Sequence, residues 1–464
     1  MKQRPTLAAA AALLALAAFP LSARAQAPAE TFVERVDVNV VNVEVFVTDR
    51  QGNPITGLSA DDFRLFVDGE EVPISNFYAE VAGDPAQRAA RPARPAAGPR
   101  ASDEAMVVPA ETPPEQVLYM TVLVDNANIR PVHRKRVFGA LRELLAGGLP
   151  TEARVSIASL GVGQTLTIHS DYLSNRAVLG KILDELEAAP AANVGAEIQQ
   201  RQILSELTRG AGGRGLGLGQ DAALLARIRA FSQEEYNRGL VSLDALSRFV
   251  ASLGGVPGRR ALMYVADGIP VRPGEDLFYT WASATSGAGN SSDTQLGDVT
   301  QYRREIGDFD LTRQFDQLAE MANASRVTVY TLDAAGSHTD FVRGAVTEGR
   351  VPSDALSAFE ANYRDPQELV AQATGGRRLA ATTRLAAELA EVTRDFVTFY
   401  SLGFEADAAD DPQRHKIKVE LADGKGRIVR YRQAVVAKPE EMEIAERAIA
   451  TLLYGTGSNP LDVS

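Results

Sequence analysis

Five short apolar runs, rich in β-branched residues, alternate along the chain with segments of helical periodicity. The apolar runs are Val117–Val124, Val155–Leu160, Ala261–Ala266, Val327–Leu332 and Phe396–Leu402. The helical segments are Pro131–Leu145, Arg176–Ala188, Leu240–Leu253, Thr312–Ala324 and Leu385–Arg394. This alternation predicts an α/β fold, a mostly parallel, doubly wound sheet with helices on both faces. Such a sheet binds ligands outside the carboxyl ends of its strands.

Alternation of apolar and polar residues, which is typical of half-buried strands, flanks this region on both sides. It covers residues 32–81 and residues 412–437, and it predicts a small antiparallel β-domain and a C-terminal hairpin. We expect the C-terminal strands to stand alone or to pair with the N-terminal β-domain, which would make the α/β domain of residues 115–404 an insertion. Residues 82–114 are rich in Ala, Pro and Arg and predict a disordered linker. A final amphipathic helix is expected over residues 439–455.

Two insertions interrupt the strand–helix alternation, at residues 193–236 and 269–304. The first contains a glycine-rich run from Gly210 to Gly219, which invites comparison with a phosphate-binding loop. No Gly-Lys-Ser/Thr triplet follows it and no apolar strand precedes it. A flexible loop is therefore the better interpretation of this run.

The first 25 residues have the three regions of a secretory signal peptide. Lys2 and Arg4 precede an apolar stretch from Leu7 to Leu21, and Ala23-Arg24-Ala25 forms a small-residue cleavage site. We expect cleavage after Ala25, a secreted or periplasmic protein, and no transmembrane segment after cleavage. Cysteine is absent, so stability in an oxidising compartment must come from a buried core. The formal net charge of −12 opposes binding to nucleic acid.

Three carboxylates follow predicted strands directly. Asp125 ends the first strand, Asp267-Gly268 ends the third and Asp333 ends the fourth. Because the carboxyl ends of parallel strands share one edge of the sheet, Asp125 and Asp267 would lie close together if their strands are neighbours. Carboxylate and amide oxygens suit Mg²⁺, Ca²⁺ or Mn²⁺. The alternative is that each aspartate caps the segment that follows it.

Several motifs occur in an order that resembles the von Willebrand factor A-type domain, and more closely its bacterial VWFA-related branch. They are VNVVNVEVFVTDRQGNPITGLSADDFRLFVDG, PGRRALMYVADGIP, VTVYTLDAAG, and the ending ATGGRR…FYSLGFEAD…HKIKVEL. The resemblance covers roughly Glu115–Phe404. It implies a Rossmann-like sheet and a metal-ion-dependent adhesion site, in which a divalent ion at the upper rim holds an acidic group of a protein ligand.

The metal motif of that family, Asp-x-Ser-x-Ser, is degenerate in this chain. The matching residues are Asp125-Asn126-Ala127-Asn128-Ile129, so both serine hydroxyls are replaced by aliphatic side chains. Asp125, Asn128 and Asp267 are the candidate ligands that remain, for Mg²⁺ or another divalent cation. The two asparagines stand between the motif positions, so Asn128 would reach an ion only along a different loop path.

Catalytic signatures are missing from the sequence. The four histidines, His133, His169, His338 and His415, show no metal-binding spacing, and neither a G-x-S-x-G elbow nor a thiol is present. We therefore expect a binding module with an unknown protein partner rather than an enzyme. The alternatives are a non-catalytic structural component of a cell-envelope assembly, working through its β-domain and C-terminal helix, and a hydrolase that uses Asp125 and Asp267.

Overall fold

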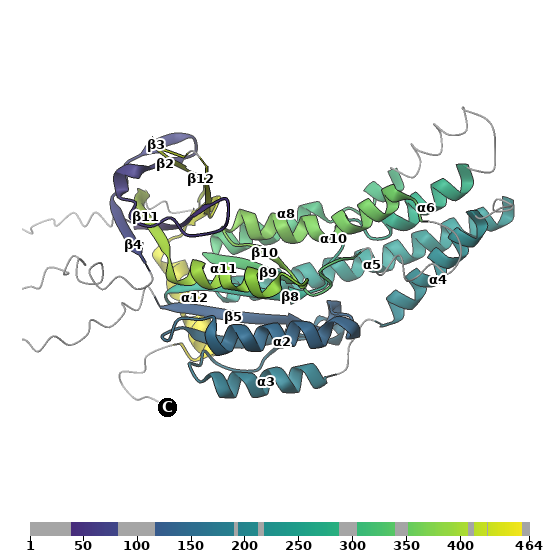
Figure 1. The fold of residues 1–464 in the computed structure, drawn as a ribbon, viewed down its shortest axis with the longest axis horizontal. Helices are drawn as coiled ribbons and strands as arrows, with labels where there is room; N and C mark the ends of the chain where they lie inside the picture. The colour runs from purple at the N-terminus through teal and green to yellow at the C-terminus, as the bar shows by residue number, and fades with distance from the viewer. Residues whose placement is uncertain are drawn as a thin grey trace, which may run out of the picture. The chain divides into compact units, whose positions relative to one another are not determined.

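We describe a computed structural model of the chain, for residues 39–81, 117–189, 194–211, 218–286, 304–338, 351–406, 413–424 and 426–456. The expected signal peptide and linker lie outside these ranges, and so does most of the glycine-rich run. The fold class expected from the sequence is confirmed: a mostly parallel sheet lies between helices, and antiparallel sheets flank it (Figure 1).

The parallel sheet has six strands in the order β10-β9-β8-β5-β6-β7. The first strand in sequence, β5 (Leu118–Asp125), is central and pairs with β6 (Arg154–Leu160) on one side and β8 (Arg259–Ala266) on the other. β9 (Val327–Asp333) lies next to β8, and the short β10 (Arg378–Ala380) pairs with β9 at the edge of the sheet. The opposite edge strand, β7 (Leu166–Ile168), is antiparallel.

Helices pack on both sides of this sheet. One layer consists of α2 (Pro131–Gly147), α3 (Arg176–Ala188) and α11 (Leu385–Val397), and α2 contacts the other two. The other layer contains α8 (Thr312–Ala324), which contacts α5 (Leu218–Ser252) and α10 (Ser353–Ala373). Figure 1 shows α2 and α3 on one side of the strands and α8 and α10 on the other. Buried aliphatic side chains of both layers and of the sheet form the largest core.

The strands at the two ends of the sequence form two four-stranded antiparallel sheets around a common core. One sheet has the order β13-β1-β11-β4 and the other β14-β12-β2-β3. The N-terminal strands are β1 (Asn39–Asp49), β2 (Phe63–Val67), β3 (Glu70–Val72) and β4 (Asn76–Glu80). The C-terminal strands are β11 (Phe399–Ala406), β12 (Gln413–Leu421), β13 (Arg427–Tyr431) and β14 (Ala434–Ala437). Since β1 pairs with both β11 and β13, the α/β region is inserted between two halves of one β-sandwich.

One sequence expectation about the C-terminal strands was wrong, and a second was met only in part. The run Phe396–Leu402 does not extend the parallel sheet, because β11 pairs with β1 and β4. The expected hairpin forms only in part, because β14 pairs antiparallel with β12, whereas β13 pairs with β1 in the other sheet. The chain changes sheets at Arg432, whose buried guanidinium donates to carbonyls at the end of α8.

The two insertions contribute helices with a core of their own. The first supplies α4 (Val194–Ala211) and the start of α5, and the second supplies α6 (Glu275–Ser286). Apolar side chains of these helices pack against the amino-terminal half of α10, around Phe231, Phe278 and Phe359. The 35-residue helix α5 contributes side chains to both cores. One continuous helix therefore connects the core of the insertions with the core of the sheet domain.

The β-sandwich meets the parallel sheet at the amino-terminal end of β8. The guanidinium of Arg259, the first residue of β8, lies 3.1 Å from Glu44 of β1 and 3.6 Å from the ring centre of Phe399. The final helix, α12 (Glu440–Tyr454), packs on α5, where the hydroxyls of Tyr454 and Ser252 are 2.6 Å apart. The carboxyl ends of the parallel strands therefore lie away from the sandwich.

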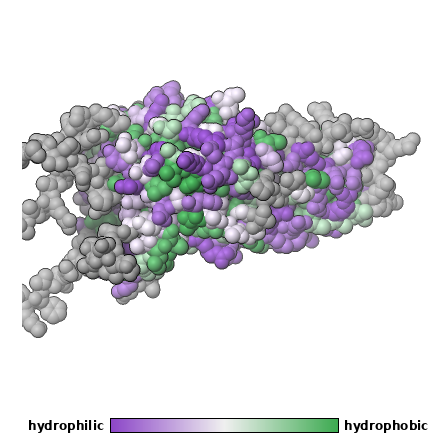
Figure 2. Space-filling model, turned by 90° about the horizontal axis from the view of Figure 1, so that it is seen from below, coloured by the Kyte–Doolittle hydropathy of each residue, from purple (hydrophilic) through white to green (hydrophobic). Residues whose placement is uncertain are grey.

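The surface carries hydrophobic residues in small groups among hydrophilic ones on the face drawn in Figure 2. Among the described helices, none is both long and apolar enough to cross a membrane. Five large apolar side chains of α12 are exposed, namely Met442, Ile444, Ile449, Leu452 and Leu453.

Candidate binding site at the rim of the parallel sheet

The loops that follow β5 and β8 define the switch point of the sheet. The two strands are parallel neighbours, but the chain proceeds from β5 to β6 on one side and from β8 to β9 on the other. Loops that diverge in this way leave a crevice at the carboxyl ends of the strands. Asp125 and Asp267 stand at these two ends. Asn128 links them, since its N–H donates to Asp125 and its carbonyl accepts from the Asp267 N–H over 2.8 Å.

Asp125 is fully buried, and its oxygens accept hydrogen bonds from inside the protein. Its Oδ2 accepts from the Tyr264 hydroxyl over 2.7 Å and from Asn128 Nδ2 over 2.8 Å, and its Oδ1 accepts from the Asn128 N–H over 3.2 Å. Burial raises the pKa of Asp125, and these hydrogen bonds oppose that rise. The carboxylate thus caps the 3-10 turn Asn126–Asn128, which agrees with the alternative that this aspartate caps the segment after its strand.

Asp267 is engaged by the start of α2. Its Oδ2 accepts from the backbone N–H of Arg130 over 3.1 Å and from the Arg130 Nε over 2.8 Å. Its Oδ1 lies 2.8 Å from Nδ1 of His133. Gly268 follows with φ of +106°, and a Cβ there would lie 2.4 Å from the Gln367 side chain, so glycine is required. Both aspartates therefore hold the β5–α2 loop in place.

These residues do not fit the divalent ion that the family resemblance implies. Donor groups of the protein already occupy the oxygens of both aspartates, and the guanidinium of Arg130 brings a positive charge to Asp267. Ala127 and Ile129, at the positions of the motif serines, are buried and supply no oxygen ligand. Within the described ranges, no group of three His, Asp or Glu side chains is arranged to hold a metal ion.

Asp333, the third predicted rim carboxylate, lies at the end of β9 in a separate ion-pair cluster. Its Oδ2 is 2.5 Å from Arg378 Nη2 and 3.1 Å from His338 Nε2, and all three residues are buried or nearly so. Burial alone would raise the pKa of Asp333, but the hydrogen bond with His338 and the charge of Arg378 hold it below its ordinary value. The sequence does not reveal this cluster, because Arg378 lies on a strand too short to show a pattern.

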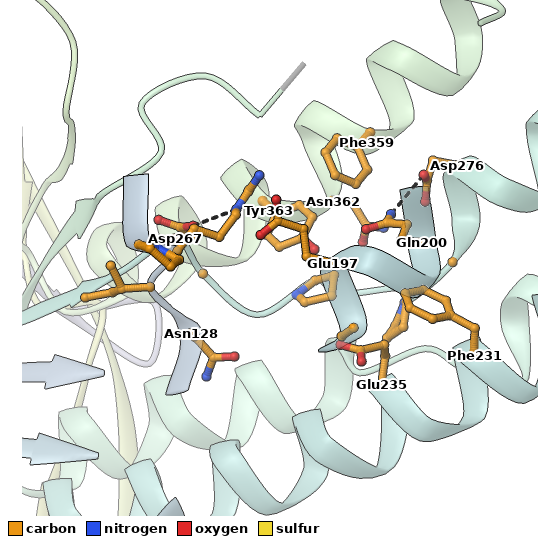
Figure 3. Close-up of a pocket in the computed structure, with 18 residues that line it drawn as sticks. Asn128, Glu197, Gln200, Phe231, Glu235, Asp267, Asp276, Phe359, Asn362 and Tyr363 are labelled. Carbon is orange, nitrogen blue, oxygen red and sulfur yellow. Dashed lines mark hydrogen bonds and ion pairs between the residues drawn. The ribbon is translucent and has the colours of Figure 1, made fainter. Parts of the chain in front are cut away.

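A cavity of about 80 Å³ opens beside Asp267, between the rim loops and the helices of the two insertions. We call it the rim cavity. Its walls include Asp267 from the sheet, Glu197 and Gln200 from α4, Phe231 and Glu235 from α5, Asp276 from α6, and Phe359, Asn362 and Tyr363 from α10. Figure 3 shows these side chains, with Asp267 on the strand side and Asp276 on the helical side. Except for Asp267, these residues were not identified from the sequence, because the sequence of an insertion does not show which of its side chains face the rim.

A larger open groove adjoins the cavity and shares Arg130 and Glu197 with it. This rim groove of about 720 Å³ lies between the first turn of α2 and the loops that follow β9 and β10. Val132 and Arg136 of α2 line it, and the Val132 side chain is 77% exposed. A concave surface of mixed polarity at the switch point is suited to binding a segment of another molecule.

The remaining histidines show no catalytic arrangement. His169 Nε2 lies 2.8 Å from Ser159 Oγ. Ser159 belongs to β6 and His169 follows the edge strand β7, and neither residue lines the rim cavity or the rim groove. His415 pairs with Asp68 in the β-sandwich.

No family model matches the chain, and no curated protein sequence matches it. Solved structures with some similarity include an aerotolerance-related membrane protein from Bacteroides fragilis (10% identity, TM-score 0.25, 60% of this chain and 98% of that one). Others are BatB from Bacteroides thetaiotaomicron (9%, 0.23, 60% and 98%) and the manganese-loaded TRAP protein of Plasmodium vivax (10%, 0.24, 68% and 93%). At these identities and TM-scores the similarity does not extend to site residues or ligands.

Proposed function

We propose that the chain is an exported binding module that holds a protein partner at the rim of its α/β domain and needs no metal ion to do so. The observation that carries this proposal is the pair of hollows at the switch point, the rim cavity and the rim groove. The aspartates of the rim bind groups of the protein itself, which argues against their use as metal ligands or as an acid–base pair.

Two features support placing the α/β domain in the VWFA-related branch of the von Willebrand factor A-type family. The family motifs occur in order along the sequence, and the sheet order agrees with the Rossmann-like sheet that the resemblance implies. In this assignment the adhesion site is a degenerate one. Export rests on the N-terminal 25 residues, and amino-terminal sequencing of the protein recovered from periplasm or medium tests it, with Gln26 expected as the first residue.

Affinity capture from a cell-envelope extract tests the binding function. The variant Val132→Asp with Arg136→Glu changes exposed side chains of the rim groove, and the control variant Ile449→Gln with Leu452→Gln changes exposed side chains of α12. We expect the wild type and the α12 variant to retain a partner that the rim variant binds at least about tenfold less well. Equal capture by the rim variant contradicts the proposal.

A structural role in an envelope assembly is the second candidate, and the exposed side of α12 favours it. The helix buries Ala450 and Tyr454 but exposes Ile449 and Leu452, which is typical of a helix that packs on another protein. In this case the same experiment gives the opposite result, because the α12 variant loses the partner and the rim variant keeps it.

A further inference from the structure

The wall of the rim cavity carries more negative than positive charge. Four carboxylates line it, those of Glu197, Glu235, Asp267 and Asp276, together with the single cation Arg130. Three of the four have a cationic partner, since Glu197 pairs with Arg201, Glu235 with Arg238, and Asp267 with Arg130. Asp276 differs from them.

Asp276 is a buried carboxylate whose side-chain partner is neutral. It is 1% exposed, and Gln200 Nε2 donates to its Oδ2 over 3.1 Å. No ion pair joins it to another described residue. Removing a carboxylate from water without a compensating cation is costly, and burial accordingly raises the pKa of Asp276 to about 7. A positive charge placed in the cavity would offset this cost.

A polar group behind Gly274, a residue of this wall, makes no hydrogen bond to the described residues. The hydroxyl of Ser232 is completely buried and makes no hydrogen bond to the described residues. It points at Gly274, which lines the cavity, since a Cβ on Gly274 would lie 2.0 Å from Ser232 Oγ. Buried hydroxyls normally have a hydrogen-bond partner, so Ser232 is an exception beside the cavity.

Aromatic rings complete the wall. Phe231, Phe359 and Tyr363 line the cavity, and Figure 3 shows them around the carboxylates. Aromatic faces attract ammonium and guanidinium groups, and about 80 Å³ has room for a few heavy atoms. We propose that the rim cavity binds the cationic end of a lysine or arginine side chain presented by a protein partner. This inference rests on the binding function proposed above and assigns the chemistry of its ligand.

Saturation-transfer NMR on the full chain tests the proposal with capped tripeptides. The probes are Gly-Arg-Gly, Gly-Lys-Gly and the uncharged citrulline analogue of the first, together with agmatine as a free cation. We expect the arginine or the lysine peptide to bind saturably, and the citrulline peptide at least about tenfold more weakly. Equal binding of the arginine and citrulline peptides overturns the proposal. If agmatine binds as tightly as the arginine peptide, the part of the proposal that requires a protein partner is overturned.

Variants locate the binding. Asp276→Asn should weaken the arginine peptide about tenfold, whereas Asp365→Asn, at an exposed aspartate of α10 outside the cavity, should leave it unchanged. Glu235→Gln provides a second cavity variant if Asp276→Asn does not fold. An unchanged affinity in both cavity variants contradicts the proposal. This measurement uses no partner protein. Its result is therefore independent of the result of the capture experiment with the rim-groove variant.

Discussion

Arg130 Nε donates to Asp267 Oδ2 over 2.8 Å, and the backbone N–H of Arg130 reaches the same oxygen. The Asp267 side chain is 5% exposed and that of Arg130 18%, so solvent screens this ion pair only weakly. It joins the start of α2 to the end of β8, two elements far apart in the sequence.

Replacing Asp267 should therefore destabilise the fold. Asp267→Ala leaves Arg130 and His133 without their acceptor, and breaking a buried pair from one side typically costs about 3–5 kcal/mol. We expect the free energy of unfolding to fall by about 2–4 kcal/mol in urea denaturation. Asp365→Ala removes a surface pair with Arg364 and should change it by less than about 0.5 kcal/mol. A similar loss in both variants would contradict the prediction that the Asp267 contacts stabilise the fold more than a surface ion pair does.

Divalent metal ions should not stabilise the protein. A ligand that binds only the folded state stabilises it by an amount that grows with the logarithm of the ligand concentration relative to the dissociation constant. The oxygens of Asp125 and Asp267, however, already accept hydrogen bonds from Tyr264, Asn128 and Arg130. We expect thermal melts with millimolar Mg²⁺, Ca²⁺ or Mn²⁺ to coincide with melts in EDTA. A rise that disappears in Asp125→Ala would establish a metal site and refute the metal-independent proposal.

The stability of the protein should depend on pH through Asp276. Its pKa is about 7 in the folded state against an ordinary value of 3.8, so between these values the folded state holds a proton that the unfolded state has lost. Stability from this group is therefore lost as pH rises from about 4 to about 7. The side chain of the Asp276→Asn variant cannot ionise. The free energy of unfolding of this variant should therefore rise relative to that of the wild type over this window, by about 2–4 kcal/mol at pH 8. Urea denaturation at pH 4.5 and 8 measures the difference, and an equal effect at both values contradicts the prediction.

Gly255 should be essential for the docking of α12. A Cβ on Gly255 would lie 1.9 Å from the carbonyl oxygen of Glu446, so Gly255→Ala must displace the helix and should cost about 2–4 kcal/mol. Gly139, in the interior of α2, has open space where the methyl group of an alanine would lie, so Gly139→Ala should stabilise by about 0.5–1 kcal/mol. Thermal melts of the two variants, which carry the same chemical change, should shift in opposite directions.

The strands and helices of the α/β region could be predicted largely from the sequence. The expected strand Val155–Leu160 and the expected helices Arg176–Ala188 and Thr312–Ala324 agree with β6, α3 and α8 to within one residue. Local spacing decides these elements, because an apolar face has to be buried wherever it lies. The same spacing does not show which strand becomes a neighbour, and β11 was therefore assigned to the wrong sheet.

The candidate site could be predicted only in part, for the same reason. Asp125 and Asp267 follow strands, so their position at one edge of the sheet was expected from the sequence. Their partners were not, since Arg130 and His133 lie 137 and 134 residues from Asp267 along the chain. The sequence patterns of the insertion helices also do not show which of their side chains line a cavity.

The sequence by itself thus determined the α/β fold class and the aspartates at the rim of its sheet, because each of these depends on residue type and local periodicity. The tertiary structure decided what the aspartates bind and what the rim can hold. Arg130, His133 and Tyr264 reach the two carboxylates only when β5, β8 and α2 are packed together, and the rim cavity exists only where two distant insertions meet the switch point of the sheet.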